Sequence, residues 1–159
     1  METTYSRTEL IAQIRQFPQQ VEALVAPLTD VQLTTQTPVE AWDIAQIVHH
    51  LADSHMNAFI RLKLLLTEDH PTLKPYDQDA WAQMVDETTP DLTASLTILR
   101  GLHTRWAIVF AALTTADWQR TAHHPEIGTV TAADILESYA QHCRDHLAQM
   151  ERVLQAQTS

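Results

Sequence analysis

The sequence has little glycine, a single cysteine and no long apolar run. Only 2 of its 159 residues are Gly, which argues against Gly-rich phosphate loops and turn-dense β folds and favours helices. One Cys cannot form an intrachain disulfide, which suits a reducing cytosol. No apolar stretch approaches the roughly 20 residues of a membrane span, and no basic-then-apolar signal pattern opens the chain. We therefore expect a cytoplasmic protein without a membrane partner.

Acidic residues outnumber basic ones. The chain has 20 Asp and Glu against 10 Lys and Arg, which gives a net charge of −10. This charge supports solubility and disfavours nucleic acid as a partner, because phosphate groups are repelled by it. A length of 159 residues with 45% hydrophobic content suits one domain, residues 1–159, with a full core.

Apolar residues recur at helical spacing in four long segments, two of them in the first half of the chain. The first follows a capping box of Ser6 and Glu9. Pro18 interrupts this segment, which predicts either a kink or two helices that meet there. The second begins after Asp43, a good N-cap residue, and extends to about Thr67.

The second half of the chain contains the other two long segments. A third helix is predicted to start around residues 89–90, and Thr131 opens the last one. Residues 76–85 could form a short helix across the bundle, and residues 119–130 a loop or short hairpin. The pattern predicts an all-α protein, a four-helix bundle with a short crossing helix.

The last helical segment has two histidines on its apolar face. His142 and His146 are four residues apart, which places their Cβ atoms roughly 5–6 Å apart on one side of a helix. Such a pair can bind one divalent metal, although about 0.5 pairs at this spacing are expected by chance among 9 His. Buried imidazoles need partners, and either a metal ion or hydrogen bonds from neighbouring helices would satisfy them.

The second and third helices contribute further histidines. Periodicity ranks His55 first, His50 second and His49 last as inward-facing residues of the second helix. His50 lies on the flank of the apolar stripe, where it can still face a second neighbouring helix. His103 in the third helix is also inward, and a core histidine bonded to a carbonyl or carboxylate is one interpretation of it.

Several sequence runs together resemble a known family. The most specific is residues 42–57, which read WDIAQIVHHLADSHMN; the others are residues 59–64, 74–77, 80–81, 102–106 and 124–126. These runs resemble the DinB-like superfamily, in particular its YfiT-type metal-dependent hydrolases, over nearly the whole chain. The resemblance implies a single DinB-type four-helix-bundle domain, a cytoplasmic location and a homodimer.

The resemblance also implies a metal site. It places one divalent transition metal per chain, zinc or nickel, on His50, His142 and His146, with His50 taking the place that periodicity gave to His55. Three neutral imidazoles leave room for water or substrate on the ion, which is a catalytic pattern. The implied function is hydrolysis of a small-molecule substrate, with metal-bound water as the nucleophile.

The general base and the reaction type stay open at this level. No HExxH glutamate accompanies the histidine pair, and the candidates for a base are Asp53, His55, His124 and Glu126. His124 and Glu126 could equally belong to a solvated loop. A metal-dependent thiol S-transferase of the bacillithiol type, using a low-molecular-weight thiol, is the first alternative function. A bundle that binds metal for stability or sensing, without catalysis, is the second.

Overall fold

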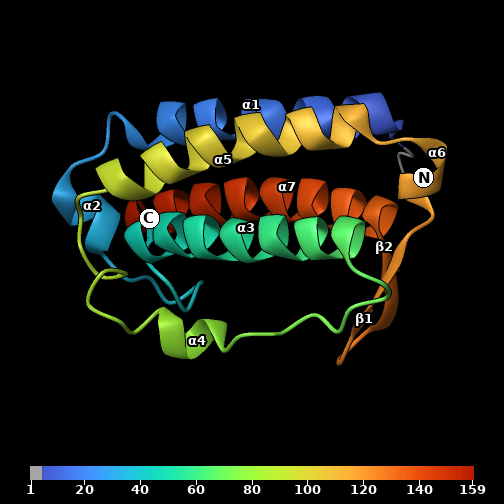
Figure 1. The fold of residues 1–159 in the computed structure, drawn as a ribbon. Coiled ribbons are helices and arrows are strands. Elements are labelled where there is room, and N and C mark those ends of the chain that lie inside the picture. The colour runs from blue at the N-terminus through green and yellow to red at the C-terminus, as the bar shows by residue number, and fades with distance from the viewer. Residues whose placement is uncertain (1–4) are drawn as a thin grey trace.

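The computed structural model describes residues 5–159 and is mostly helical, with one small hairpin (Figure 1). Its elements are α1 (Arg7–Val25), α2 (Asp30–Thr34), α3 (Ile44–Thr67), α4 (Gln78–Trp81), α5 (Thr93–Ala112), α6 (Thr115–Trp118), β1 (Thr121–His124), β2 (Gly128–Thr131) and α7 (Ala132–Gln157). The four long helices α1, α3, α5 and α7 form a bundle, which confirms the predicted fold class. The short helix predicted for residues 76–85 is present only as the four-residue α4, which lies in the connection alongside α3 (Figure 1). Within residues 5–159, no helix combines the length and apolar character needed to cross a membrane.

The order of the long helices around the bundle differs from their order in the chain. Helix α1 packs on α5 and α7, and α3 packs on the same two helices. Figure 1 shows α1 and α7 running in one direction and α3 and α5 in the other. The consecutive long helices α1 and α3 therefore lie diagonally across the bundle. Since α3 and α5 are parallel, the connection between them has to return along the whole length of the bundle, and it carries α4 on the way.

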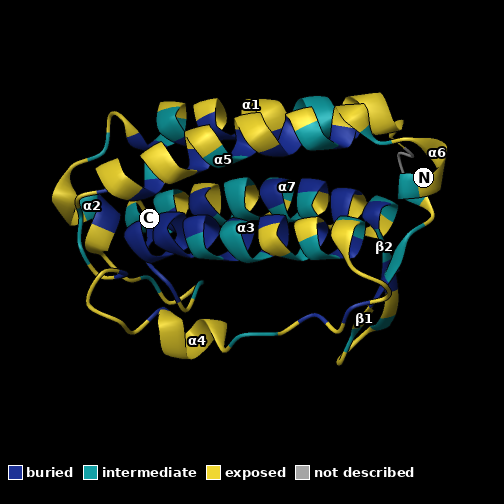
Figure 2. Cartoon of the chain, in the orientation of Figure 1, coloured by how far each residue is buried: buried dark blue, intermediate teal, exposed yellow. Residues whose placement is uncertain are grey.

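The core lies where the four long helices face one another (Figure 2). Each contributes large side chains with no exposed surface, such as Phe17, Ile47, Leu99 and Leu136. Burying one side chain of this kind stabilises a fold by about 1.5–3 kcal/mol. Helix α3 is buried over more of its circumference than the others, because the returning connection covers its outer side. A site beside α3 can therefore be enclosed between this helix and the returning connection.

Predicted caps begin three of the four long helices. The side chain of Ser6 caps α1, that of Asp43 caps α3 and that of Thr131 caps α7, each as part of a capping box. In α3 the backbone N–H of Gln46 donates to Asp43 Oδ1 at 2.8 Å. Caps of this type contribute about 0.5–2 kcal/mol each. They also fix the register of the histidines that follow in α3 and α7.

Three details of the helices differ from the sequence prediction. Helix α1 is one continuous helix with Pro18 inside it, so the two-helix alternative is wrong. Helix α5 starts at Thr93, later than predicted, after an N-cap residue, Leu92, that makes no side-chain cap. His49, ranked last as an inward residue, is only 4% exposed because α5 and the segment before it cover that side of α3.

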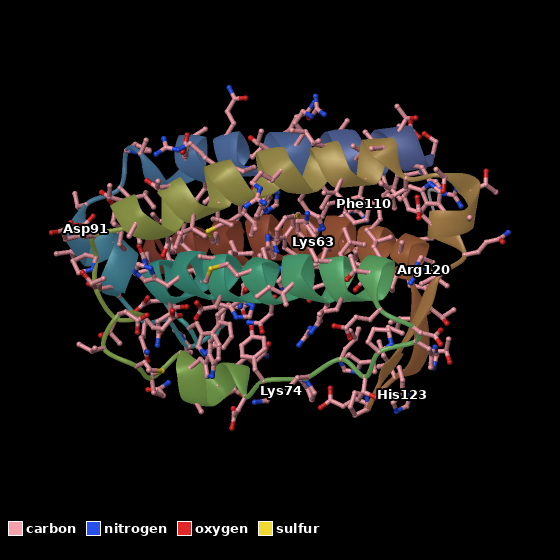
Figure 3. All side chains as sticks on the ribbon, viewed as in Figure 1. Lys63, Lys74, Asp91, Phe110, Arg120 and His123 are labelled. Atoms are coloured by element: carbon pink, nitrogen blue, oxygen red, sulfur yellow. The ribbon has the colours of Figure 1, made fainter. Side chains whose placement is uncertain are left out.

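The hairpin and the end of α3 are tied together. Strands β1 and β2 pair antiparallel, and Gly128 adopts a left-handed conformation (φ 84°) at the turn. The N–H of Leu73 donates to the carbonyl of His123, which attaches the α3–α4 connection to β1. Arg120, labelled in Figure 3, donates to the carbonyl of Leu65 at 3.0 Å and so holds the end of α3. The hairpin confirms one of the two predictions for residues 119–130.

Candidate metal centre

Three histidines from two helices meet in the bundle. His50 on α3 and His142 and His146 on α7 each present a ring nitrogen within 4.8 Å of the other two. His50 is 3% exposed, and the other two are half-buried. The ring of His50 packs on Trp42, with 4.7 Å between the two ring centroids. The structure therefore brings together the set that the family resemblance implies, and places His55 deeper in the core.

A chain of hydrogen bonds behind His142 determines which of its nitrogens carries the proton. His103 Nδ1 lies 2.6 Å from the carbonyl oxygen of Ile14, which can only accept, so this nitrogen is N–H. His103 Nε2 then accepts from His55 Nδ1 at 2.7 Å, and His55 Nε2 accepts from His142 Nδ1 at 3.0 Å. His142 therefore has its proton on Nδ1 and a free lone pair on Nε2.

The sequence explains why the carbonyl oxygen of Ile14 is free to accept a hydrogen bond from His103. In a helix the carbonyl of Ile14 would accept from the backbone N–H of residue 18. That residue is Pro18, which has no N–H, so the carbonyl has no helical partner. The imidazole of His103 occupies it instead, and His103 and His55 are both fully buried.

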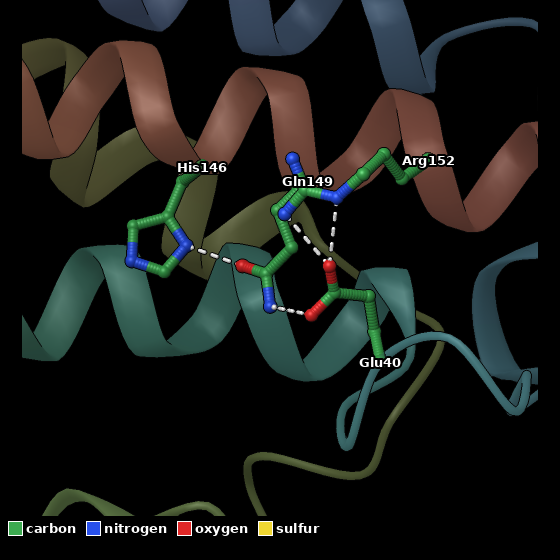
Figure 4. A network of polar contacts seen from close by, with 4 residues as sticks. All are labelled: Glu40, His146, Gln149 and Arg152. Carbon is green, nitrogen blue, oxygen red and sulfur yellow. Dashed lines mark hydrogen bonds and ion pairs between the residues drawn. The ribbon is translucent and has the colours of Figure 1, made fainter.

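A second network fixes the proton on His146 (Figure 4). Gln149 Nε2 donates to Glu40 Oε2 at 3.0 Å, so the amide oxygen of Gln149 faces His146. That oxygen lies 2.6 Å from His146 Nδ1, which must be the donor. Arg152 in turn donates to Glu40 Oε1 at 2.7 Å. Burial alone would raise the pKa of Glu40, but hydrogen bonds from Arg152 and Gln149 lower it below its usual range.

The two networks leave a pair of acceptors facing each other. His142 Nε2 and His146 Nε2 lie 3.0 Å apart, and each bears a lone pair once its Nδ1 carries the proton. Two lone pairs at this separation repel unless a cation lies between them. No protein hydrogen bond to the ring of His50 is found among the residues that the structure describes. The donor set thus fits a divalent metal that prefers imidazole.

Burial keeps these histidines neutral. It lowers the pKa of His50 to about 3 and that of His142 to about 2, and in both cases the charge of His146 adds to the effect. Burial also lowers the pKa of His146. Only the neutral imidazole has a lone pair for a metal, so all three side chains are in their metal-binding form at neutral pH.

A pocket opens beside His142 and contains two of the predicted acid–base residues. Its volume is about 430 Å³, and His124 and Glu126 of the hairpin line it together with His142. The N–H of Glu126 donates to His124 Nδ1 at 3.2 Å. His124 is half-buried and Glu126 is exposed, so both side chains have access to a bound molecule. Their role as acid and base stays a prediction.

The other two candidates for a base lie elsewhere. Both ring nitrogens of His55 are occupied by other histidines, and the side chain has no exposed surface, so it cannot reach a substrate. Asp53 contacts Glu87 of the α4–α5 connection instead of lining the pocket. Burial and the neighbouring Asp53 raise the pKa of Glu87 to about 8. The carboxyl group of Glu87 therefore keeps its proton at neutral pH.

Sequence reasoning did not identify Glu40, Arg61, Tyr76 and Tyr139 as parts of the site. Tyr139 could have been identified from the sequence, because it lies one helical turn before His142 on the same face of α7. Its ring centroid is 5.5 Å from that of His142. Glu40, Arg61 and Tyr76 come from other segments, and no periodicity within α7 could have indicated them.

The chain is similar to known proteins over most of its length. The model of the DinB superfamily matches residues 13–150. A protein of Oceanobacillus iheyensis is 41% identical over 140 residues, which cover 88% of this chain and 81% of that protein. YfiT of Bacillus subtilis is 39% identical over 136 residues, covering 85% and 76% respectively. Both are named as proposed metal-dependent hydrolases.

Solved structures show the same fold. The structure of YfiT from Bacillus subtilis, described as a proposed metal-dependent hydrolase with an unusual four-helix bundle topology, superimposes with a TM-score of 0.89 at 35% identity. The match covers 96% of this chain and 90% of that one. A mycothiol-dependent maleylpyruvate isomerase superimposes with a TM-score of 0.72 at 14% identity, covering 92% and 61%. The second likeness concerns the fold alone.

Proposed function

The chain belongs to the DinB superfamily, and on this basis we propose that it is a metal-dependent hydrolase of a small-molecule substrate. In this proposal His50, His142 and His146 hold one divalent transition metal, zinc or nickel. The names of the relatives support the metal-dependent hydrolase assignment, and the chain covers most of their length.

One observation carries the proposal. His142 Nε2 and His146 Nε2 face each other at 3.0 Å, and separate hydrogen-bond networks place the protons of both rings on the opposite nitrogens. A core that needed only hydrogen-bonded histidines would put a donor opposite an acceptor at this point. Two opposed lone pairs beside a pocket favour a cation site that a substrate can reach.

In this proposal the metal ion and the protein residues contribute different parts of the chemistry. Held by His50, His142 and His146, a divalent ion would supply Lewis-acid chemistry, because it would polarise a substrate oxygen and make water more acidic. The chain supplies the pocket that orients the substrate, and His124 and Glu126 are placed to accept or deliver a proton there. The hairpin that carries them is anchored to the α3–α4 connection, which keeps their position defined.

The proposal is tested with a panel of activated esters and amides. We expect hydrolysis by the protein loaded with zinc or nickel, loss of activity after chelation, and recovery when the metal is returned. Each substrate is measured with and without a low-molecular-weight thiol. Product formation that depends on the added thiol would contradict hydrolysis and indicate thiol transfer. Metal binding without turnover on any substrate would leave a non-catalytic metal protein.

A further inference from the structure

The pocket beside His142 contains a cationic side chain far along α3 from the metal ligands. Arg61 lies three helical turns after His50 and lines the same 430 Å³ pocket as His142. Its Nη2 donates to the carbonyl of Lys74 at 2.7 Å, and its Nη1 lies 3.5 Å from the hydroxyl of Tyr139. Lys74, labelled in Figure 3, is part of the connection that runs beneath α3. The guanidinium is thus held in place by neutral oxygen atoms.

Within residues 5–159, the charge of Arg61 has no ion-pair partner. The ion pairs of residues 5–159 are Arg100 with Glu22 and Arg152 with Glu40, and neither involves Arg61. Its Nε is buried and makes no hydrogen bond. In a chain with a net charge of −10, a half-buried guanidinium with a free N–H is unusual. Such a group recognises planar anions through charge-assisted hydrogen bonds.

A second unsatisfied donor lies in the same pocket. The hydroxyl of Tyr76 is buried and has no partner in hydrogen-bond geometry among the residues that the structure describes, although Ser54 is close to it. Burial raises the pKa of Tyr76 to about 12, so the hydroxyl keeps its proton. An unpaired buried hydroxyl costs about 1–3 kcal/mol, which a bound acceptor would recover. Arg61 and Tyr76 therefore present donors to one space, with Tyr139 between Arg61 and His142.

The acidic residues of the pocket limit the charge of the ligand. Glu126 and Asp145 also line it, but both are exposed and so are solvated at its edge. Asp145 Oδ1 accepts from Gln141 Nε2 at 2.6 Å. One guanidinium and neutral hydroxyls balance a single negative charge, whereas a phosphate dianion would leave an excess opposite these carboxylates.

We propose that the substrate carries a carboxylate that binds Arg61 and Tyr76 while its hydrolysable group lies at the three histidines. This inference rests on the proposed hydrolase function and assigns a substrate class to the same site. The pocket volume suits a small carboxylic acid derivative rather than a peptide or a polymer. Arg61 and Tyr76 determine specificity and orientation, and they take no part in bond cleavage.

Binding of an unreactive ligand tests the inference without relying on turnover. Glutarate is titrated calorimetrically into the metal-loaded parent and the variants Arg61→Met, Tyr76→Phe and Lys63→Met. We expect Arg61→Met to weaken binding about 10–100-fold and Tyr76→Phe about 3–10-fold, as for the loss of charge-assisted and neutral hydrogen bonds. Lys63 is an exposed cation on the same helix, so its replacement is the matched control and should leave binding unchanged.

Tyr76→Phe keeps the test decisive if Arg61→Met folds poorly. The hydroxyl that it removes has no protein partner, so the variant should be at least as stable as the parent while binding glutarate less well. Equal affinity of the parent, Tyr76→Phe and Arg61→Met for glutarate would overturn the inference. Tighter binding of inorganic phosphate than of glutarate, with the difference lost in Arg61→Met, would also overturn it, because Arg61 would then prefer a phosphate to a carboxylate.

A pair of esters separates this inference from the proposed function. The mono-4-nitrophenyl ester of glutaric acid and 4-nitrophenyl valerate have the same chain length and differ in the terminal carboxylate. We expect the parent to prefer the acidic ester in kcat/KM by about 10–100-fold, and Arg61→Met to lose that preference. Equal kcat/KM values in the parent would contradict the carboxylate. If neither ester is hydrolysed, the hydrolase proposal is weakened, and the glutarate titration still decides the role of Arg61.

Discussion

Single hydrogen bonds determine how His142 and His146 present their nitrogens. Each ring uses Nδ1 as a donor, to His55 in one case and to Gln149 in the other, which leaves Nε2 for a metal. Partners of this kind fix the tautomer and the orientation of a ligating imidazole. The inner network ends on the carbonyl of Ile14, which Pro18 leaves without a helical donor.

The variant His55→Leu tests this arrangement. It removes the acceptor for His142 Nδ1 but keeps an apolar side chain in the fully buried position. We expect metal affinity to fall about 10–100-fold, the usual effect of losing a partner behind a metal ligand. The measurement is a calorimetric titration with zinc. The matched control is His123→Leu, since His123 is exposed on β1; a similar loss in that variant would contradict the interpretation.

The raised pKa of the buried carboxyl group of Glu87 predicts an effect on stability. Burial first, and Asp53 second, raise the pKa of Glu87 to about 8. Because the folded pKa lies above the unfolded one, the contribution of Glu87 to stability is complete below about pH 4.5 and is lost as pH rises through 8. The loss has a slope of up to about 1.4 kcal/mol per pH unit.

Replacement of this carboxyl should remove the pH dependence. We expect the free energy of unfolding of Glu87→Gln, from urea denaturation, to lack the decline that Glu87 causes between pH 6.5 and 8 and to exceed that of the parent at pH 8. Glu137→Gln, at an exposed position of α7, serves as the control and should follow the parent. Parallel profiles for the parent and Glu87→Gln would show that Glu87 is ionised in the fold.

How far the residues of the site could be predicted from the sequence depends on how far apart they lie along the chain. His142 and His146 lie on one helix, so their spacing was sufficient to identify the pair. The choice of His50 over His55 needed the family resemblance, because periodicity cannot tell which neighbouring helix a flanking residue faces. Arg61 and Tyr76 belong to segments that meet only through the return of the chain along the bundle, and no local pattern reveals such a meeting.

Among the elements, α3 shows how local signals and packing combine. Its predicted start after Asp43 and its end at Thr67 agree with the structure, because the cap and the apolar stripe are both local. The start of α5 was missed, because no side chain caps it and the carbonyl of Thr89 is bound by His49. Helix α6 was not predicted either, since four residues are too few to establish a periodicity.

Loss of the N-terminal cap of α3 should weaken both the fold and the metal site. Asp43→Ala removes the acceptor for the N–H of Gln46, and we expect a loss of about 0.5–2 kcal/mol in the free energy of unfolding. His50 lies two turns into the helix, so metal affinity should fall as well when the first turn frays. Asp43→Asn retains a capping oxygen and should restore most of both properties. Equal losses in the two variants would argue against capping as the cause.

The arrangement of the whole bundle could not be read from periodicity. Four amphipathic helices predict a bundle, but the stripes do not say that α1 and α3 lie diagonally. That arrangement puts α3 next to α7, which joins His50 to His142 and His146. It also puts α5 between α1 and α3, so that His103 reaches both the carbonyl of Ile14 and the ring of His55.

Neutral histidines in the core predict acid sensitivity of the metal-free protein. Burial lowers the pKa of His103 to about 4, despite its hydrogen bond to Ile14. Because the folded pKa is below the unfolded value of 6.5, the contribution of His103 to stability is complete above about pH 6.5 and is lost as pH falls toward 4. We expect a contribution of up to about 1.4 kcal/mol per pH unit in this window.

Urea denaturation between pH 4.5 and 7.5 measures this slope. His103→Gln should show a smaller slope than the parent, because it lacks the titrating group. His123→Gln replaces an exposed histidine and is the control. A slope that does not change in His103→Gln would mean that other groups cause the acid sensitivity.

The metal content of the purified, untagged protein decides whether His50, His142 and His146 form a metal site. Elemental analysis of the parent is compared with His50→Ala, His142→Ala and His146→Ala, and with His123→Ala as a control outside the cluster. We expect about one transition-metal ion per chain in the parent and the control, and its loss in each of the other three variants. No metal in the parent after incubation with zinc and nickel would contradict this expectation, and the facing nitrogens of His142 and His146 would need another explanation.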